Sequence, residues 1–434
     1  MTTIIKLPPE VLREILRHVH DGIERHRYAR RYPPPDRFEL KGIDFRENLC
    51  SLRSVNRVFH KLVTPLLFQH ALITSGSGVL RLQQLSKSPL RRLVRRLEIC
   101  VEVHPVADFD LYETKLEENK DRNLMYLGRL AIAIHSAFPR FTGLKILKLD
   151  FVDIPYNFDL ETDHVLSTVC MSGCRWEQDT ANLFESFATA MRRSQLDDLD
   201  EVDLSLPLAF DFGHFLDENN DEDDNDGDAK KYSMKAFFQR LKSLRLHCGR
   251  STDDGEDTEF RFRQPNEEYD KYIRQLLPLA PNINSLKLMG SDFFRLDQSA
   301  FAPLHLRSLM LSSLSTTGDA FTALVQQSTA LEEVILEGVY LESGMWKDIF
   351  WAMSQSSITS LYVEFCGYHW DGESAHFRPP NPGSRRSDSY IETTEVEDLD
   401  AYKAVFARVR ANKRRLFGSN YDEAADVEST PFPR

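Results

Sequence analysis

One short pattern of apolar residues, apolar-x-x-apolar-x-apolar, constrains the fold of this chain more than any other feature. The last two apolar positions of each match lie two residues apart, so they share one face of a β-strand. A short strand with its helix cannot bury that face alone, and neighbouring units must stack. The pattern occurs eight times, at Val94-Leu97-Ile99, Leu144-Leu147-Leu149, Leu199-Val202-Leu204, Leu241-Leu244-Leu246, Ile283-Leu286-Leu288, Leu306-Leu309-Leu311, Leu331-Val334-Leu336 and Ile358-Leu361-Val363.

Helical segments lie between the matches, for example at 182–191, 321–325 and 346–353. The matches start 50, 55, 42, 42, 23, 25 and 27 residues apart, and the last three spacings fall inside the period of leucine-rich repeats. The pattern resembles such repeats, without their asparagine or cysteine position. We therefore predict an α/β fold, an irregular leucine-rich-repeat-like solenoid with parallel strands and helices. The alternative is a set of unrelated buried strands in an α/β domain, because short apolar runs are ambiguous.

The first residues of the chain predict a short amphipathic helix. Pro8 and Pro9 suit a first helical turn, where a missing N–H costs nothing, and Glu10 suits the positive end of the helix dipole. Apolar side chains then recur at helical spacing, and such a short helix must pack against something. These apolar residues are Val11, Leu12, Ile15, Leu16 and Val19.

A second apolar block spans residues 48–72, with Leu49, Leu52, Val55, Val58 or Phe59, and Leu62 at helical spacing. Pro65 is expected to end this helix or to open the next short one. Between the two blocks, residues 21–46 are rich in arginine and contain three consecutive prolines, which predicts a solvated basic loop.

The two blocks together resemble the F-box motif, particularly its fungal variety. The resemblance is carried by LPPEVLREIL and then NLCSLRSVNRVFHKLVTPLLF, in which the matching residues are Leu7, Pro8, Val11, Leu12, Ile15, Leu16, Leu52, Val55, Asn56, Arg57, Phe59, Leu62, Pro65, Leu66, Leu67 and Phe68. It covers residues 6–70, and the insertion at 21–46 is longer than the usual link. The alternative is that the same apolar stripe closes an internal helical bundle.

The F-box resemblance implies a helical bundle that docks on a Skp1-like protein and, through it, on a cullin. The residues that it implies for Skp1 contact are Leu7, Pro8, Val11, Leu12, Ile15, Leu16, Leu52, Val55, Leu62 and Pro65. A domain this small has little core of its own, which also favours binding to a partner. In one large class of F-box proteins a leucine-rich-repeat array follows the motif, as it does in the order of parts here.

The charge of the chain is unevenly distributed. Residues 1–100 contain 19 Lys+Arg and 9 Asp+Glu, whereas the remainder contains 35 and 58, for a net charge of −13. An acidic body argues against nucleic acid as its partner and favours basic patches on a protein substrate. No apolar run reaches the length of a membrane span, and the N-terminus lacks the features of a secretory signal. The six widely spaced cysteines suit free thiols in the cytoplasm or nucleus.

The sequence contains no motif that predicts an enzyme. The phosphate-binding, dinucleotide-binding, nucleophile-elbow and HExxH patterns are all missing, so we expect neither catalysis nor a cofactor. We also expect no metal site. Cys170 and Cys174 have no second pair at zinc spacing, and His18 and His20 are two apart, which does not place them on one helix face. A calcium loop that started at Glu222, within the acidic run at 217–228, would place Ser233 at its twelfth position, where a bidentate glutamate is needed.

The predicted domains are a 1–72 F-box domain with the insertion at 21–46, and a 73–373 array with a disordered acidic insert at about 217–230. A linker at 374–397, a capping helix at 398–417 and a disordered tail at 418–434 complete the chain. The function predicted is that of a substrate adaptor for a Skp1-cullin-F-box ubiquitin ligase. The alternatives are a Skp1-binding or repeat-type scaffold that is not coupled to degradation, and an enzyme whose site lies in the long inserts.

Overall fold

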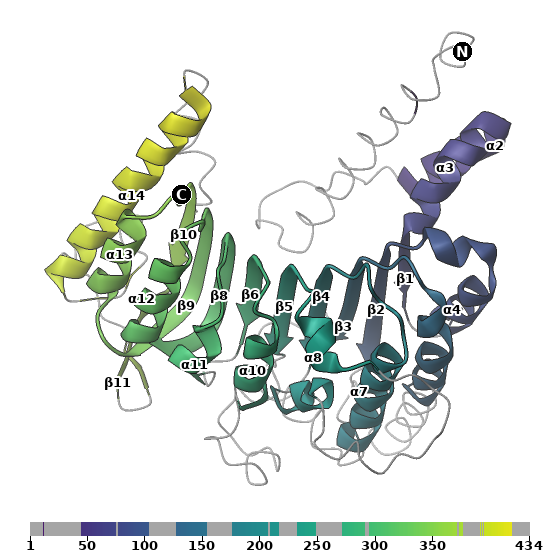
Figure 1. Ribbon diagram of the computed structural model, residues 1–434, viewed down its shortest axis with the longest axis horizontal. Helices are drawn as coiled ribbons and strands as arrows, with labels where there is room; N and C mark the ends of the chain where they lie inside the picture. Colours follow the sequence, from purple (N-terminus) through teal and green to yellow (C-terminus); the bar gives the residue numbers. More distant parts are fainter. Residues whose placement is uncertain are drawn as a thin grey trace, which may run out of the picture.

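The computed structural model places the eight repeated apolar patterns in one parallel β-sheet (Figure 1). It describes residue 12 and residues 45–74, 77–103, 127–153, 176–206, 209–216, 232–248, 271–290, 295–370, 373–375, 391, 393 and 395–418. The predicted basic loop lies outside these residues, apart from its last two positions. The acidic insert and the terminal tail also lie outside them, apart from Gly418.

The strands follow one another along the sheet in the order β1-β2-β3-β4-β5-β6-β8-β9-β11-β12, while β10 pairs with β9 and β7 with β8. All pairings are parallel except that of β11 with β12. The strands are β1 (His70–Ile73), β2 (Arg96–Val103), β3 (Ile146–Asp153), β4 (Glu201–Leu206), β5 (Ser243–Cys248), β6 (Ser285–Met289), β7 (Arg295–Leu296), β8 (Ser308–Thr317), β9 (Glu333–Ser343), β10 (Ser360–Glu364), β11 (Gly367–Trp370) and β12 (Glu373–Ala375). Since consecutive strands are neighbours, the chain advances along the sheet one strand–helix unit at a time. The predicted α/β class with parallel strands is confirmed.

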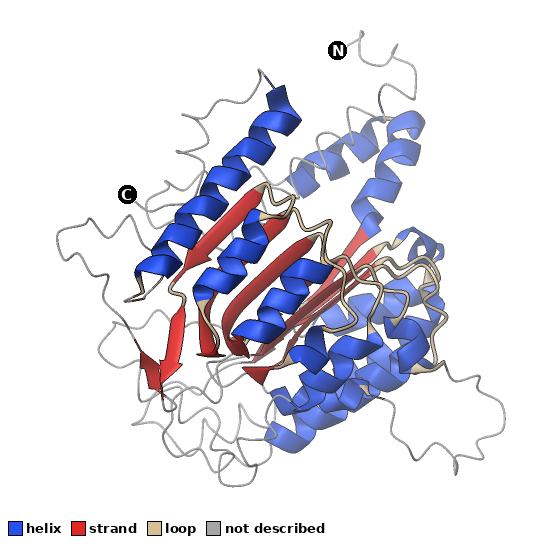
Figure 2. Cartoon of the chain, turned by 60° about the vertical axis from the view of Figure 1, so that its left-hand side comes forward, coloured by secondary structure: helices blue, strands red, loops and turns tan. Residues whose placement is uncertain are grey.

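The helices of these units lie along one face of the sheet (Figures 1 and 2). They include the helical residues 127–137, α4 (Ser77–Lys87), α7 (Trp176–Arg192), α8 (Met234–Phe238), α10 (Lys271–Leu276), α11 (Gln298–Phe301), α12 (Gly318–Gln327) and α13 (Trp346–Ser354). Two further helices, α2 (Phe45–Val55) and α3 (Arg57–Gln69), precede β1, and α14 (Val396–Phe417) lies at the opposite end of the sheet. We name the sheet face that carries no described helix the open face.

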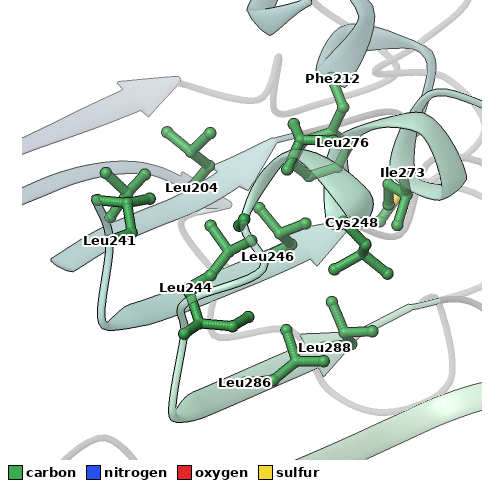
Figure 3. Packing of buried hydrophobic residues seen from close by; sticks show 14 of the residues in the cluster. Leu204, Phe212, Leu241, Leu244, Leu246, Cys248, Ile273, Leu276, Leu286 and Leu288 are labelled. Carbon is green, nitrogen blue, oxygen red and sulfur yellow. The ribbon is translucent and has the colours of Figure 1, made fainter. Parts of the chain in front are cut away.

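The apolar pairs of the repeated pattern form the core, as their two-residue spacing requires. Leu244 and Leu246 of β5 are at most 1% exposed and contact leucines from neighbouring strands and helices (Figure 3). The first residue of each pattern is buried as well, with Leu241 at 0% exposure. All eight patterns share one register, in which Leu97, Leu147, Val202, Leu244, Leu286, Leu309, Val334 and Leu361 lie side by side.

The backbone stacks the units at the start of each strand. The carbonyl of Lys145 accepts hydrogen bonds from the N–H groups of Asp200 and Glu201, at 2.9 and 3.0 Å. The same double acceptance repeats at the carbonyls of Arg95, Asp200, Lys242, Asn284, Arg307 and Glu332. This ladder keeps the register constant although the patterns start between 23 and 55 residues apart, because the extra residues lie between the strands and not within them.

A buried carboxylate fastens α14 to the last unit. Asp398, at 0% exposure, accepts hydrogen bonds from the Lys347 backbone N–H at 2.8 Å, the Tyr368 hydroxyl at 2.6 Å and the Thr393 hydroxyl at 2.7 Å. The first turn of α13 has no side-chain cap of its own, so Asp398 supplies one from another helix. Near the other end of α14, the buried Asn412 donates to the carbonyl of Ile358 at 2.8 Å.

Candidate functional site

Two surfaces are candidates for binding, and the first is formed by α2 and α3. Asn56 separates the two helices, because its side chain accepts hydrogen bonds from the backbone N–H groups of Val58 and Phe59 at 2.8 and 2.9 Å. The prediction that Pro65 ends the helix or opens the next one was wrong. Pro65 lies inside α3, and the break falls at Asn56, whose capping bonds outweigh the continued apolar period.

The sequence period of the second apolar block is therefore interrupted. Leu49 is buried at 5% exposure and Leu52 is half-buried, whereas Val55 is 58% exposed. On α3 the apolar positions divide between two sides. Phe59 and Val63 face the interior at 7% and 0% exposure.

Leu12 joins Leu49, Phe59 and Val63 in a small apolar cluster, at 4% exposure. Leu12 was predicted to contact a partner, and its side chain lies within this chain's own cluster. A partner contact through Leu12 would therefore require the cluster to open. The other predicted contacts of the first block, Leu7, Pro8, Val11, Ile15 and Leu16, lie outside the described residues.

The outward side of α3 carries a second set of apolar residues. Val58 is 46% exposed and Pro65 is exposed, whereas Leu62 between them is half-buried and also packs against the Leu12 cluster. These positions follow one another at spacings of four and three residues, which places them on one helix face. Together with Val55, the last residue of α2 before the break at Asn56, they form the set of residues that we name the α3 stripe. Three of its four members were predicted contacts. The sequence period allowed either Val58 or Phe59 on the helical face, and neither was among the predicted contacts; the fold buries Phe59 and exposes Val58.

Loss of the Asn56 cap should destabilise the start of α3. We expect Asn56→Ala to lower the free energy of unfolding by about 1 kcal/mol, because two backbone N–H groups lose their acceptor. Urea titration followed by circular dichroism would measure the change. Substitution Asn56→Asp keeps the acceptor and should remain close to the parent protein. An equal loss in both variants would show that the side-chain oxygen is not the stabilising group.

The open face of the sheet is the second candidate surface, and in its first half the charges pair internally. The side chains of Glu98, Lys148, Asp203, Arg245 and Lys287 lie in one row across β2 to β6. Lys148 is 3% exposed, and its ammonium lies 2.7 Å from Asp150, 3.6 Å from Glu98 and 3.9 Å from Asp203.

Burial dominates the electrostatics of this row. It raises the pKa of the Asp203 carboxyl, against the opposing positive charges of Lys148 and Arg245. Burial also lowers the pKa of Lys287, and the neighbouring Arg245 lowers it further. A buried charge is costly unless an opposite charge compensates it, so the charged side chains in this half of the open face pair with one another.

Two groups on the open face invite a chemical interpretation. Ligand atoms of Glu98, Cys100 and Asp150 lie within 4.8 Å of one another, but the Lys148 ammonium already compensates the two carboxylates. Ser205 and His247 form a hydrogen bond of 2.9 Å. In that row Asp150 lies on the serine side and Met289 beyond the histidine, which is not the order of a serine–histidine–carboxylate triad.

Among the described cysteines, Cys366 is fully buried, and burial raises the pKa of its thiol to about 12. It is therefore a protonated packing residue at neutral pH. Cys100 and Cys248 are also buried and Cys50 is exposed, and these four are free thiols. Within the described segments, no helix combines the length and apolarity that crossing a bilayer requires. No family model matches the sequence, and no curated protein matches it either.

Proposed function

We propose that this chain is an F-box-type adaptor, which binds a Skp1-like protein through its N-terminal helices and holds a protein substrate on its sheet. In this proposal the sheet and its stacked helices are an irregular leucine-rich-repeat-like array. The ubiquitin chemistry belongs to the cullin-based ligase, and this chain contributes proximity and orientation.

The α3 stripe is the observation that carries the proposal. Val55 and Val58 expose about half of their surface on two helices that project from the β1 end of the sheet (Figure 1). The small apolar cluster beneath them is separate from the main core of the array. An exposed apolar face on a small helical unit indicates a place where another protein packs.

The sequence order supports the same conclusion. The residues that resemble an F-box occur in the order of that motif, and the sheet begins with β1 immediately after α3. The backbone N–H of Arg95, next to β2, donates to the carbonyl of Gln69 at the end of α3, at 2.8 Å. This short connection would hold a substrate on the array at a defined orientation to a bound Skp1-like protein.

The test replaces exposed residues instead of the buried Leu12. We expect the double substitution Val55→Asp and Val58→Asp to weaken binding of a purified Skp1-like protein at least about 100-fold, because two apolar contacts are lost and two charges must be desolvated. Isothermal titration calorimetry with the full chain would measure the affinity.

The matched control is Leu80→Asp with Ile132→Asp, which makes two apolar-to-aspartate changes away from α2 and α3, at side chains that are 61% and 68% exposed. It should bind as the parent chain does. Thermal unfolding of all three proteins would show that the array remains folded. Undiminished binding by the double variant would refute the proposed use of the α3 stripe.

A further inference from the structure

The central row of the open face changes from charged to apolar residues between β6 and β8. The row that is charged from Glu98 to Lys287 continues as Met310, Ile335 and Tyr362 on β8, β9 and β10. The rows on either side of these residues hold hydroxyl and carboxylate side chains. We name the nine open-face residues of these three strands the acidic–apolar face; they are Ser308, Met310, Ser312, Glu333, Ile335, Glu337, Ser360, Tyr362 and Glu364.

The carboxylates of this face have only neutral donors on the same three strands. Ser308 donates to Glu333 at 2.9 Å, Ser312 donates to Glu337 at 3.5 Å, and the Tyr362 hydroxyl donates to Glu364. The nine residues include three carboxylates and neither lysine nor arginine. Glu337 and Glu364 are side by side in register, and like charges in that position repel. Lys287 on β6 is the cation whose pKa responds to Glu337, and burial already lowers the pKa of that lysine.

The spacing of the face suits an α-helix that crosses the strands. Strands are about 4.8 Å apart, so the line from Met310 to Tyr362 is about 10 Å long. A helix advances about 10.5 Å between residues i and i+7. Rows two residues apart along a strand are separated by about 6.6 Å, so Glu333 lies on one side of the apolar line and Glu337 and Glu364 on the other.

Beside this face the backbone adopts a left-handed conformation, which is free of strain at Gly338 but costs energy at Ser313 and Phe365. Ser313, Gly338 and Phe365 directly follow the row of Ser312, Glu337 and Glu364, and all three adopt positive φ angles of 52°, 59° and 52°. Phe365 is an aromatic residue in this unfavourable region and is 59% exposed. Strain of this kind persists where the surrounding structure holds it, and it is frequent at binding sites. Phe365 adds an exposed apolar side chain next to Glu364.

We infer that the acidic–apolar face binds a basic amphipathic helix of the protein substrate. This helix carries apolar residues at i, i+3 or i+4, and i+7, and lysine or arginine on both flanks. The inference rests on the proposed role of the array in holding a protein substrate and defines the chemistry of that substrate. Apolar side chains cover Met310, Ile335 and Tyr362, while the flanking cations meet the three glutamates. The first half of the open face is excluded because its charges are already paired.

The test uses a fluorescently labelled synthetic helix of about four turns, with leucine at the three apolar positions and lysine or arginine on both flanks. Fluorescence anisotropy with the full chain should show saturable binding that weakens as salt increases. The double substitution Glu337→Lys and Glu364→Lys should reduce the affinity at least about tenfold, because attraction becomes repulsion. The same peptide with glutamate in place of its cations should not bind to the parent chain.

The matched control is Glu185→Lys with Asp198→Lys, which makes the same change in net charge at two exposed positions outside the open face. This variant should bind the basic peptide within about twofold of the parent chain. Equal binding by the two double variants, or the lack of saturable binding to the parent chain, would overturn the inference. The two proposals can fail separately. If the parent chain binds the peptide but not the Skp1-like protein, the proposed adaptor function is wrong and the binding face stands. If the Val55→Asp and Val58→Asp chain loses only the Skp1-like protein, the two surfaces act independently.

Discussion

Lys148→Met is expected to lower the free energy of unfolding by about 3–5 kcal/mol at neutral pH, which is a large fraction of the stability of a typical domain. The substitution removes one charge from a group of Lys148, Glu98, Asp150 and Asp203 in which the lysine is 3% exposed. Methionine is unbranched and only one atom shorter than lysine, so the loss reports mainly the missing charge and not a large cavity. Thermal and urea unfolding would measure the change.

The pH dependence of this loss distinguishes electrostatics from packing. Burial already raises the pKa of Asp203, so the folded chain binds a proton there more tightly than the unfolded chain does. The stability that this carboxyl contributes is present at low pH and is lost as pH rises through its folded-state pKa. Removal of Lys148 takes away a charge that lowers that pKa, so the deficit of Lys148→Met should shrink between about pH 7 and about pH 4.

The control for this prediction is Lys145→Met, immediately before β3. Lys145 has an exposed side chain on the same segment, so its removal should change the free energy of unfolding by less than about 0.5 kcal/mol. If Lys148→Met were as stable as Lys145→Met at neutral pH, the ion pairs of the open face would not hold the array together. A deficit that is independent of pH would indicate a packing effect instead.

Asp398→Ala is expected to lower the free energy of unfolding by about 3–5 kcal/mol as well. It leaves the Lys347 N–H and the hydroxyls of Tyr368 and Thr393 without their acceptor in a site that is 0% exposed. Each buried donor that loses its partner costs about 1–3 kcal/mol. Burial, and then the hydrogen bond to Asp398, raise the pKa of Tyr368, so this hydroxyl remains a donor at neutral pH.

Hydrogen exchange would show where this destabilisation acts. Amides of α14 and of the first turn of α13 should exchange faster in Asp398→Ala, while those of β2 and β3 should change least, because the array unfolds from the uncapped end. Asp400→Ala is the matched control, since Asp400 makes an exposed ion pair with Lys403 on the same helix. Equal protection of α14 in both variants would contradict the capping role of Asp398.

Eight of the twelve described strands could be predicted from the sequence, whereas β1, β7, β11 and β12 contain none of the apolar patterns. Each of the eight apolar patterns became a strand, and even the 55-residue spacing between Leu144 and Leu199 did not disturb the register. The reason is that burial of a strand face requires apolar residues two apart, and this requirement is local. The helix predicted at 398–417 is present as α14, because its buried side chains Tyr402, Val405 and Val409 recur at spacings of three and four residues.

The sequence predicted less well which apolar residues are exposed on the surface. The period of the second apolar block suggested one continuous stripe through Leu49 and Val55, but the Asn56 cap divided it into a buried side and the exposed α3 stripe. Leu12 is one of a set of apolar residues at helical spacing, yet only the folded chain shows that it packs with Leu49, Phe59 and Val63. A pattern states that a residue is apolar and does not state which protein buries it.

The sequence by itself determined the positions and inward faces of the eight patterned strands and the helical segments at 182–191, 321–325 and 346–353, because these depend on the spacing of residues that are near one another in the chain. Tertiary structure alone decided which side chains meet across strands. Lys148 and Asp203 are 55 residues apart, and Ile335 and Tyr362 are 27 apart, yet each pair shares a row because parallel register brings them together. The charge-paired half and the acidic–apolar half of the open face exist only through that register.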